Sequence, residues 1–163
     1  MPLWSLKNLT DEKRMKIALA SDHGGYELKE TLKYFLKEKE IEVDDFGTFS
    51  EESVDYPDFA KKATMAVVEG KADGAVLICG TGIGMSITAN KFKGIRAALV
   101  HDIYTAQMAK EHNNANIICM GGRTTDKKLA KEMVSIWLSS KFEAGRHERR
   151  LEKIKQLEDK LLV

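Results

Sequence analysis

The stretch AVLICGTGIGMSITAN, residues 75–90, decides the fold. Its first five residues are apolar throughout, which is typical of a strand buried on both faces in the middle of a parallel sheet. Glycines then stand at 80, 82 and 84, and a helical pattern runs to about Asn90. This order predicts a glycine-rich turn at the carboxyl end of a central strand.

On either side of this stretch, short apolar runs alternate with longer amphipathic ones. Further strands are expected at 17–20, 41–45, 95–100 and 116–120. Further helices are expected at 27–39, 58–68, 103–111, 126–138 and 149–162. The alternation predicts a doubly wound α/β sandwich with a mainly parallel, five-stranded sheet. Such sheets bind ligands outside the carboxyl ends of their strands, so the residues there are the first candidates for a site.

The composition fits one packed domain in the cytoplasm. The chain has 163 residues, 43% of them apolar, and 26 basic against 25 acidic side chains. This balance gives no reason to expect nucleic acid or a membrane as a partner, and no run approaches the roughly 20 apolar residues of a membrane span. The first residues lack the apolar core of a secretory signal, and the two cysteines lack metal or redox spacing, so free thiols in a reducing compartment are expected.

Polar residues follow the first and third strands. Asp22 and His23 stand where a helix begins, so they are either a helix cap with a surface histidine or ligands for a substrate. Cys79 ends the third strand, where it is either an inert core residue or, facing the amino end of a helix, a reactive thiolate. The residues alone leave both pairs of alternatives open.

The glycine turn does not match the common nucleotide-binding motifs. No Gly-Lys-Ser/Thr follows it, as a Walker A loop requires, and Met85 occupies the third glycine position of a dinucleotide fingerprint. Asp102 does stand near the distance expected of a ribose-binding acid, so nucleotide binding stays open as an alternative.

Two further groups of polar residues lie downstream. His112 and Asn113 precede the fifth strand and Arg123 follows it, while residues 145–150 read GRHERR. Turn formers and a solvated charged face would explain these groups. Arginines beside a histidine would also suit a phosphate, because a guanidinium makes several planar contacts to phosphate oxygens.

The order of the motifs resembles a known enzyme family. The succession SDHGGYELK (21–29), DFGT (45–48), SVDYPDFA (53–60), LICGTGIGMSITANK (77–91), GIRAAL (94–99), HNNANI (112–117), GGR (121–123) and FEAGRHERR (142–150) is similar to ribose-5-phosphate isomerase B and its sugar-phosphate isomerase relatives. The resemblance covers about residues 15–154. An N-terminal extension of unknown role at 1–14 and a single domain at 15–163 are therefore expected.

The resemblance implies a Rossmann-like, three-layer α/β/α fold and a homo-oligomer, dimer or tetramer, with active sites between subunits. It implies interconversion of D-ribose 5-phosphate and D-ribulose 5-phosphate, a step of the pentose phosphate pathway, without metal or organic cofactor. The matching cysteine in that family removes the α-proton, the threonine moves a proton between the sugar oxygens, and the histidine opens the furanose ring. The implied catalytic residues are Cys79, Thr81 and His112.

The resemblance also implies a substrate-binding set. The backbone of the glycine turn would stabilise an enediolate oxygen, Asp22 and His23 would bind sugar hydroxyls, and the arginines would hold the phosphate, partly from the neighbouring subunit. The implied residues are Asp22, His23, Gly80, Thr81, Gly82, Ile83, Gly84, Asn113, Arg123, Arg146, His147 and Arg150.

Three alternatives accompany this hypothesis. The same chemistry on a hexose phosphate, such as allose 6-phosphate or galactose 6-phosphate, would use the same groups, and these residues do not reveal the length of the sugar. A nucleotide- or FMN-binding α/β module would leave Cys79 and His112 unexplained. An inactive relative that only binds a ligand is disfavoured, because nothing at the matched positions looks disabled.

Overall fold

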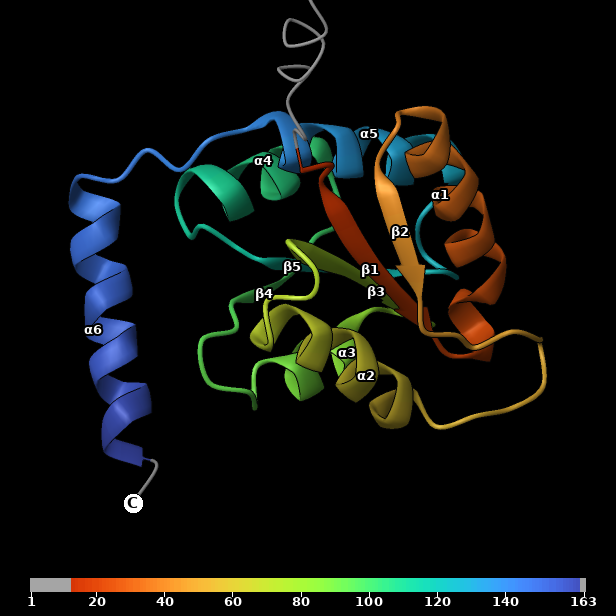
Figure 1. The fold of residues 1–163 in the computed structure, drawn as a ribbon, viewed down its shortest axis with the longest axis horizontal. Coiled ribbons are helices and arrows are strands. Elements are labelled where there is room, and N and C mark those ends of the chain that lie inside the picture. Colours follow the sequence, from red (N-terminus) through yellow and green to blue (C-terminus); the bar gives the residue numbers. More distant parts are fainter. Residues whose placement is uncertain (1–12, 162–163) are drawn as a thin grey trace, which may run out of the picture.

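The central feature of the computed structural model, which describes residues 13–161, is one sheet of five parallel strands in the order β2-β1-β3-β5-β4 (Figure 1). Each pair of neighbouring strands is parallel. The strands are β1 (Lys16–Ser21), β2 (Glu42–Asp45), β3 (Gly74–Cys79), β4 (Ala97–Leu99) and β5 (Ile117–Gly121). The central strand β3 is buried over its whole length, as its unbroken apolar run predicts.

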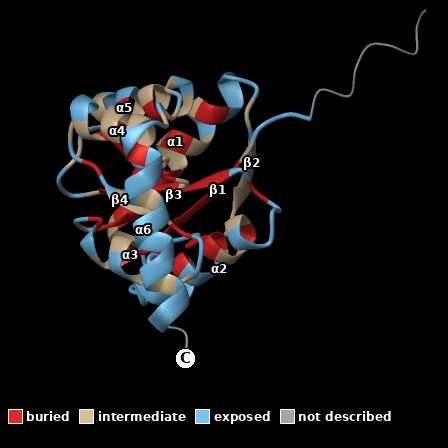
Figure 2. Ribbon diagram, turned by 90° about the vertical axis from the view of Figure 1, so that its left-hand side faces the viewer, coloured by how far each residue is buried: buried red, intermediate tan, exposed pale blue. Residues whose placement is uncertain are grey.

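Helices cover both faces of the sheet. The residues of α1 (Tyr26–Glu38), α4 (Ile103–Glu111) and α5 (Lys127–Ser139) belong to one core cluster, and those of α2 (Tyr56–Val68) and α3 (Ile83–Ala89) belong to the other. Figure 2 shows the buried strands between these two helical layers. The expected three-layer α/β/α sandwich is therefore confirmed.

The sequence of β1 explains how one strand serves both cores. Neighbouring residues of a strand point to opposite faces, so Ile17 and Leu19 enter the cluster under α1 while Ala18 and Ala20 enter the cluster under α2. The second face is built largely from alanines, among them Ala60 and others on α2. Small side chains let α2 lie close against the sheet.

The element ends differ from the expected ones by a few residues. The strand expected at 95–100 is confined to β4, because Ile95 N–H turns back to the Phe92 carbonyl and Arg96 N–H donates to the Asn116 side chain. The last helix, α6 (Arg146–Leu161), begins three residues earlier than expected. Residues 1–12 of the expected extension and Leu162 of the expected last helix lie outside the described residues.

The last helix stands apart from the three layers, beside the β4 edge of the sheet (Figure 1). Polar bonds join it to the loop before β4: Gly94 N–H donates to Glu158 over 2.9 Å, and Lys93 pairs with Asp159 at 2.8 Å. Ile154 and Leu157 on this helix remain exposed. No helix among residues 13–161 is long and apolar enough to cross a membrane.

Candidate active site

Three chain segments meet at the carboxyl edge of the sheet, after β1, β3 and β5. Asp22 N–H donates to the Ile78 carbonyl, and Gly122 N–H donates to the Cys79 carbonyl over 2.8 Å. Arg123 N–H donates to the Gly80 carbonyl. These backbone bonds bring the predicted residues after three different strands to one place, as the rule for open parallel sheets predicts.

Cys79 lies at the centre of this edge, on the last residue of β3. Its side chain is nearly enclosed, with 4% of its surface exposed, and its Sγ accepts a hydrogen bond of 3.1 Å from the Gly82 N–H. Gly82 has φ +80°, and a Cβ there would lie 2.7 Å from the Met120 carbonyl carbon. A side chain at 82 is therefore disfavoured by both conformation and space, and glycine allows the backbone to direct its N–H at the sulfur.

The rest of the turn faces outward. Thr81 is exposed, and its Oγ1 accepts from the Ile83 N–H over 3.3 Å. Gly80 leaves room for Arg123, because a Cβ at position 80 would lie 3.0 Å from the Arg123 Nη1. The turn thus presents a hydroxyl, backbone groups and a guanidinium around the thiol.

The pair after β1 is held in a defined geometry. Asp22 is buried and caps the short 3₁₀ helix η2 (His23–Gly25), accepting from the Gly25 N–H over 3.2 Å. His23 Nδ1 accepts from the Val54 N–H over 3.2 Å, so its proton sits on Nε2. Asp22 therefore does act as a cap, while His23 keeps an N–H donor available for a ligand.

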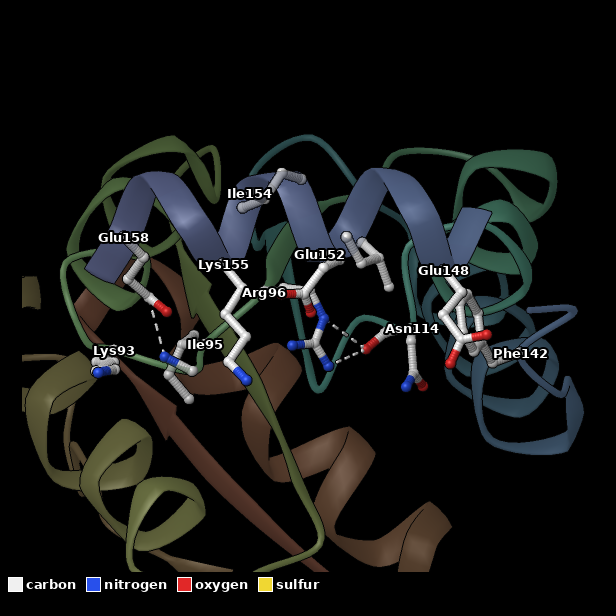
Figure 3. A pocket seen from close by; sticks show the side chains of 12 residues that line it. Lys93, Ile95, Arg96, Asn114, Phe142, Glu148, Glu152, Ile154, Lys155 and Glu158 are labelled. Atoms are coloured by element: carbon white, nitrogen blue, oxygen red, sulfur yellow. Dashed lines mark hydrogen bonds between the residues drawn. The ribbon is translucent and has the colours of Figure 1, made fainter. Parts of the chain in front are cut away.

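A cavity of about 800 Å³ opens beside these residues. His23, Gly24 and Glu51 line it together with Arg123 and residues of the first turn of α5. A second cavity, of about 400 Å³, separates α6 from the loop before β4 and is lined by Arg96, Lys155 and Glu158 among others (Figure 3). Only the first cavity contains residues that the sequence singled out.

The remaining predicted residues lie at the opposite edge of the sheet. α4 runs back from the carboxyl end of β4, so His112 at its end lies near the amino end of β5. The Asn113 carbonyl accepts from Arg96 Nε over 3.0 Å, just before β4. Arg146, His147 and Arg150 occupy the first turns of α6, and the His147 ring stacks on that of His112 with centroids 4.0 Å apart.

The two edges are well separated. β3 alone spans six residues, and at about 3.3 Å per residue its ends are about 17 Å apart. One chain therefore brings together Asp22, His23, the glycine turn with Cys79, and Arg123, and it gathers His112, Asn113 and the α6 residues elsewhere. Neither group holds all of the functions that the resemblance implies.

Sequence reasoning missed three parts of these sites. The Tyr56 ring covers the glycine turn so closely that a Cβ at Gly84 would collide with it. Glu143 lies 3.8 Å from His112 Nε2 and 3.7 Å from His147 Nε2. The buried Lys29 bonds Asp45 over 2.7 and 2.8 Å. All three lie inside the quoted motifs, but nothing in a linear sequence pairs them with these partners.

Asp102, on which the nucleotide-binding alternative depends, is committed to local structure. It is the N-cap of α4, and its Oδ1 accepts from the Thr105 N–H over 2.6 Å in a capping box. A helix cap is a common role for an aspartate after a strand, so this residue gives no support to a ribose-binding function.

Several known proteins are similar to this chain in sequence and in fold. Escherichia coli ribose-5-phosphate isomerase B is 45% identical over 145 residues, which cover 89% of this chain and 97% of that protein. D-erythrulose-4-phosphate isomerase from Pectobacterium atrosepticum is 42% identical, over 86% of this chain and 93% of that protein. The solved structure of Clostridium thermocellum ribose-5-phosphate isomerase B superposes with a TM-score of 0.89 at 50% identity, covering 90% of this chain and 99% of that one. A family model described as Ribose/Galactose Isomerase matches residues 17–154, and the chain therefore belongs to this family of isomerases.

Proposed function

We propose that this isomerase interconverts D-ribose 5-phosphate and D-ribulose 5-phosphate, a step of the pentose phosphate pathway, with Cys79 as the base. One observation carries the proposal: a nearly enclosed thiol ends the central strand and accepts an N–H from a glycine turn, which is joined by a backbone hydrogen bond to Arg123 on the wall of the cavity. Relatives that match this chain over almost its whole length carry the name of that activity.

The chemistry requires three functions at one place. A base must take the proton from the carbon next to the carbonyl, the enediolate must be stabilised, and protons must move between the two sugar oxygens. Cys79 would serve as the base, the N–H groups of residues 80–84 as the oxyanion donors, and the Thr81 hydroxyl as the proton shuttle. A positioned base is typically worth about 10²–10⁴ in rate, and one oxyanion donor about 3–4 kcal/mol, so the turn matters as much as the thiol.

Substrate positioning would use the residues around the turn. Asp22 and the His23 Nε2–H would hold sugar hydroxyls, and Arg123 would contribute to the phosphate site. His112 would protonate the ring oxygen and open the furanose, with Asn113 beside it. The phosphate is remote from the reacting carbons, so its binding energy would position the substrate for the chemical step.

A second copy of the chain would complete the site. His112, Arg146 and Arg150 lie at the sheet edge opposite Cys79, so a dimer that brings the two edges together supplies both sets. The exposed Ile83, Ile87 and Leu99 near the carboxyl edge give such an interface apolar area. This arrangement supports the proposal that the sites are shared between two subunits of a dimer or a tetramer.

We place the enzyme in the cytoplasm, with a sugar phosphate as its small-molecule partner and no organic cofactor. Both cysteines are free, as a reducing compartment allows. Cys119 lies in the core within β5, where it packs and does not react.

The test is an assay of purified protein for the interconversion of ribose 5-phosphate and ribulose 5-phosphate, started from either sugar, with EDTA present. Cys79→Ala should abolish turnover, while Cys119→Ala is the matched control, because it removes the other buried thiol. Loss of activity in both variants, or in neither, would argue against Cys79 as the base. If the wild type acts only on hexose 6-phosphates or on D-erythrulose 4-phosphate, the pentose assignment is wrong and the isomerase chemistry stands.

A further inference from the structure

Three potential metal ligands converge at the amino edge of the sheet. The ligand atoms of His112, Glu143 and His147 all lie within 4.8 Å of one another. Glu143 Oε2 is 3.8 Å from His112 Nε2 and 3.7 Å from His147 Nε2, while the two rings stack with an interplanar angle of 14°. Among residues 13–161, this is the one such group of three.

The local backbone holds the three ligands in place. Glu143 N–H donates to the Glu111 carbonyl over 3.0 Å, which ties the segment before α6 to the end of α4. His147 is largely enclosed, and its N–H donates to the Ala144 carbonyl.

We propose that His112, Glu143 and His147 form a binding site for Zn²⁺ or a similar divalent transition metal, and that its occupancy inhibits the isomerase. Two imidazoles and one carboxylate with a fourth position left open form a common zinc ligand set. The metal is an inhibitor in this proposal and takes no part in the isomerisation.

Zinc geometry requires two changes from the arrangement seen here, a shorter distance from Glu143 to each ring and a rotation of one imidazole. Metal–ligand bonds of 2.0–2.1 Å place tetrahedral ligand atoms about 3.3 Å apart, so Glu143 must approach each imidazole by about 0.5 Å. One imidazole must also rotate out of the stack, because a metal lies in the plane of each ring that binds it. His112 ends its helix and is partly exposed, so it is the ring that is free to turn.

The charge around the site limits its affinity. Arg146 and Arg150 both disfavour added positive charge at His147, so they oppose a dication there. Glu143 offsets part of this charge and is the only carboxylate of the group. Removing that carboxylate should therefore weaken binding strongly, even though half of its side-chain surface is exposed and it has little role in packing.

The inhibition rests on the proposed function, because it requires His112 as the ring-opening acid. A metal on its Nε2 occupies the nitrogen that would otherwise carry a proton. Binding itself does not depend on that role, so the two parts can be tested separately.

The binding experiment is a competition titration of ZnCl₂ against a chelating dye, with untagged protein. Glu143→Gln should weaken binding at least about tenfold, since loss of even an outer partner of a metal site typically costs that much. Glu148→Gln is the matched control, because it removes the same charge from an exposed position in the first turn of α6. Cys79→Ala should bind Zn²⁺ as the wild type does.

Two results would overturn the site: unchanged affinity in Glu143→Gln, or binding lost in Cys79→Ala, which would assign the metal to the thiol. The activity experiment then adds ZnCl₂ to the working wild-type enzyme and reverses the effect with EDTA. If Zn²⁺ binds at this site without loss of turnover, the proposed inhibition is wrong, and so is the proposed role of His112. If the wild type binds Zn²⁺ but isomerises no sugar phosphate, the metal site is supported and the proposed function is wrong.

Discussion

Cys79 and Cys119 differ in what surrounds the thiol. Both belong to the same core cluster, but Cys119 is enclosed within β5, and burial raises the pKa of its thiol. Cys79 ends its strand beside the glycine turn and accepts the Gly82 N–H. Position at a strand end, and not residue type, separates a packing residue from a candidate base.

This difference predicts the pattern of thiol modification. In the native protein, iodoacetamide should alkylate Cys79 slowly and leave Cys119 untouched, because only the thiolate reacts and Cys119 stays protonated. Mass spectrometry of peptides after a time course measures both. Ribose 5-phosphate should protect Cys79, whereas modification of Cys119 at the same rate would contradict the assignment.

Gly82 combines two constraints that can be separated by a control. In Gly82→Ala the alanine must adopt φ +80°, and its Cβ also collides with the Met120 backbone. In Gly70→Ala the alanine must adopt φ +70°, but nothing lies within 4 Å of its Cβ. Gly70→Ala should cost about 1 kcal/mol of unfolding free energy. Gly82→Ala should cost about 1–3 kcal/mol more, because overpacking adds to the conformational strain.

Denaturant unfolding measures both variants, and the isomerase assay separates their effects on function. Only Gly82→Ala should reduce turnover, since it displaces the N–H that the Cys79 sulfur accepts. Equal stability losses at 70 and 82 would mean that the turn relaxes around the added methyl group.

At the scale of elements, an ion pair joins α1 to the end of β2. Lys29 is fully buried and bonds both oxygens of Asp45, and Lys33 adds a contact of 3.0 Å. Asp45 also accepts the Gly47 N–H, and Gly47 in turn accepts the Ser21 N–H at the end of β1. The pair therefore fixes the chain beside the candidate site as well as the helix.

Asp45→Asn should destabilise the fold by about 3 kcal/mol at neutral pH, because it removes one of the two carboxylates that pair with the buried Lys29 ammonium and leaves only Glu30. Burial alone would raise the pKa of Asp45, but hydrogen bonds from Lys29, the Gly47 N–H and Lys33 outweigh it and hold the pKa below its ordinary value. A lowered folded pKa gives stability that is present above the unfolded value and lost in acid.

The difference between wild type and Asp45→Asn should therefore shrink as pH falls from about 4, near the ordinary carboxyl pKa. Denaturant unfolding at several pH values checks this. Glu42→Gln, which removes the exposed pair with Lys16, is the control and should cost at most about 1 kcal/mol. A pH-independent difference would assign the effect to packing.

At the scale of the molecule, the sequence predicts the sheet better than it predicts the site. The unbroken apolar run of β3 and the alternation around it identify the five strands and three layers. The pattern places Cys79, Asp22 and Arg123 at strand ends, which meet at one edge in any parallel sheet. It does not reveal that α4 carries His112 to the other edge, or that the side chain of Asn116 shortens β4, because both depend on contacts between distant residues.

Within one chain, the proposed site residues lie in two groups at opposite edges of the sheet. This separation predicts that a variant that cannot assemble also loses activity. Ile87→Asp places a charge on the exposed apolar face of α3 and should shift the protein towards monomers, measured by sedimentation, with a parallel loss of turnover. Tyr34→Asp on α1 is the control, because its side chain is just as exposed but lies on another surface. Monomers with full activity would contradict a shared site.

The position of Cys79 and His112 at opposite edges also has a genetic consequence. If two subunits share the site as proposed, the products of two alleles, one encoding Cys79→Ala and the other His112→Asn, should each be inactive alone, whereas a hybrid of the two should contain one site with both native residues. Random pairing of equal amounts would restore about a quarter of the wild-type activity, because half the dimers are hybrids with one working site of two. Where growth is made to depend on this isomerase, cells that carry both alleles should therefore grow and cells with either allele alone should not.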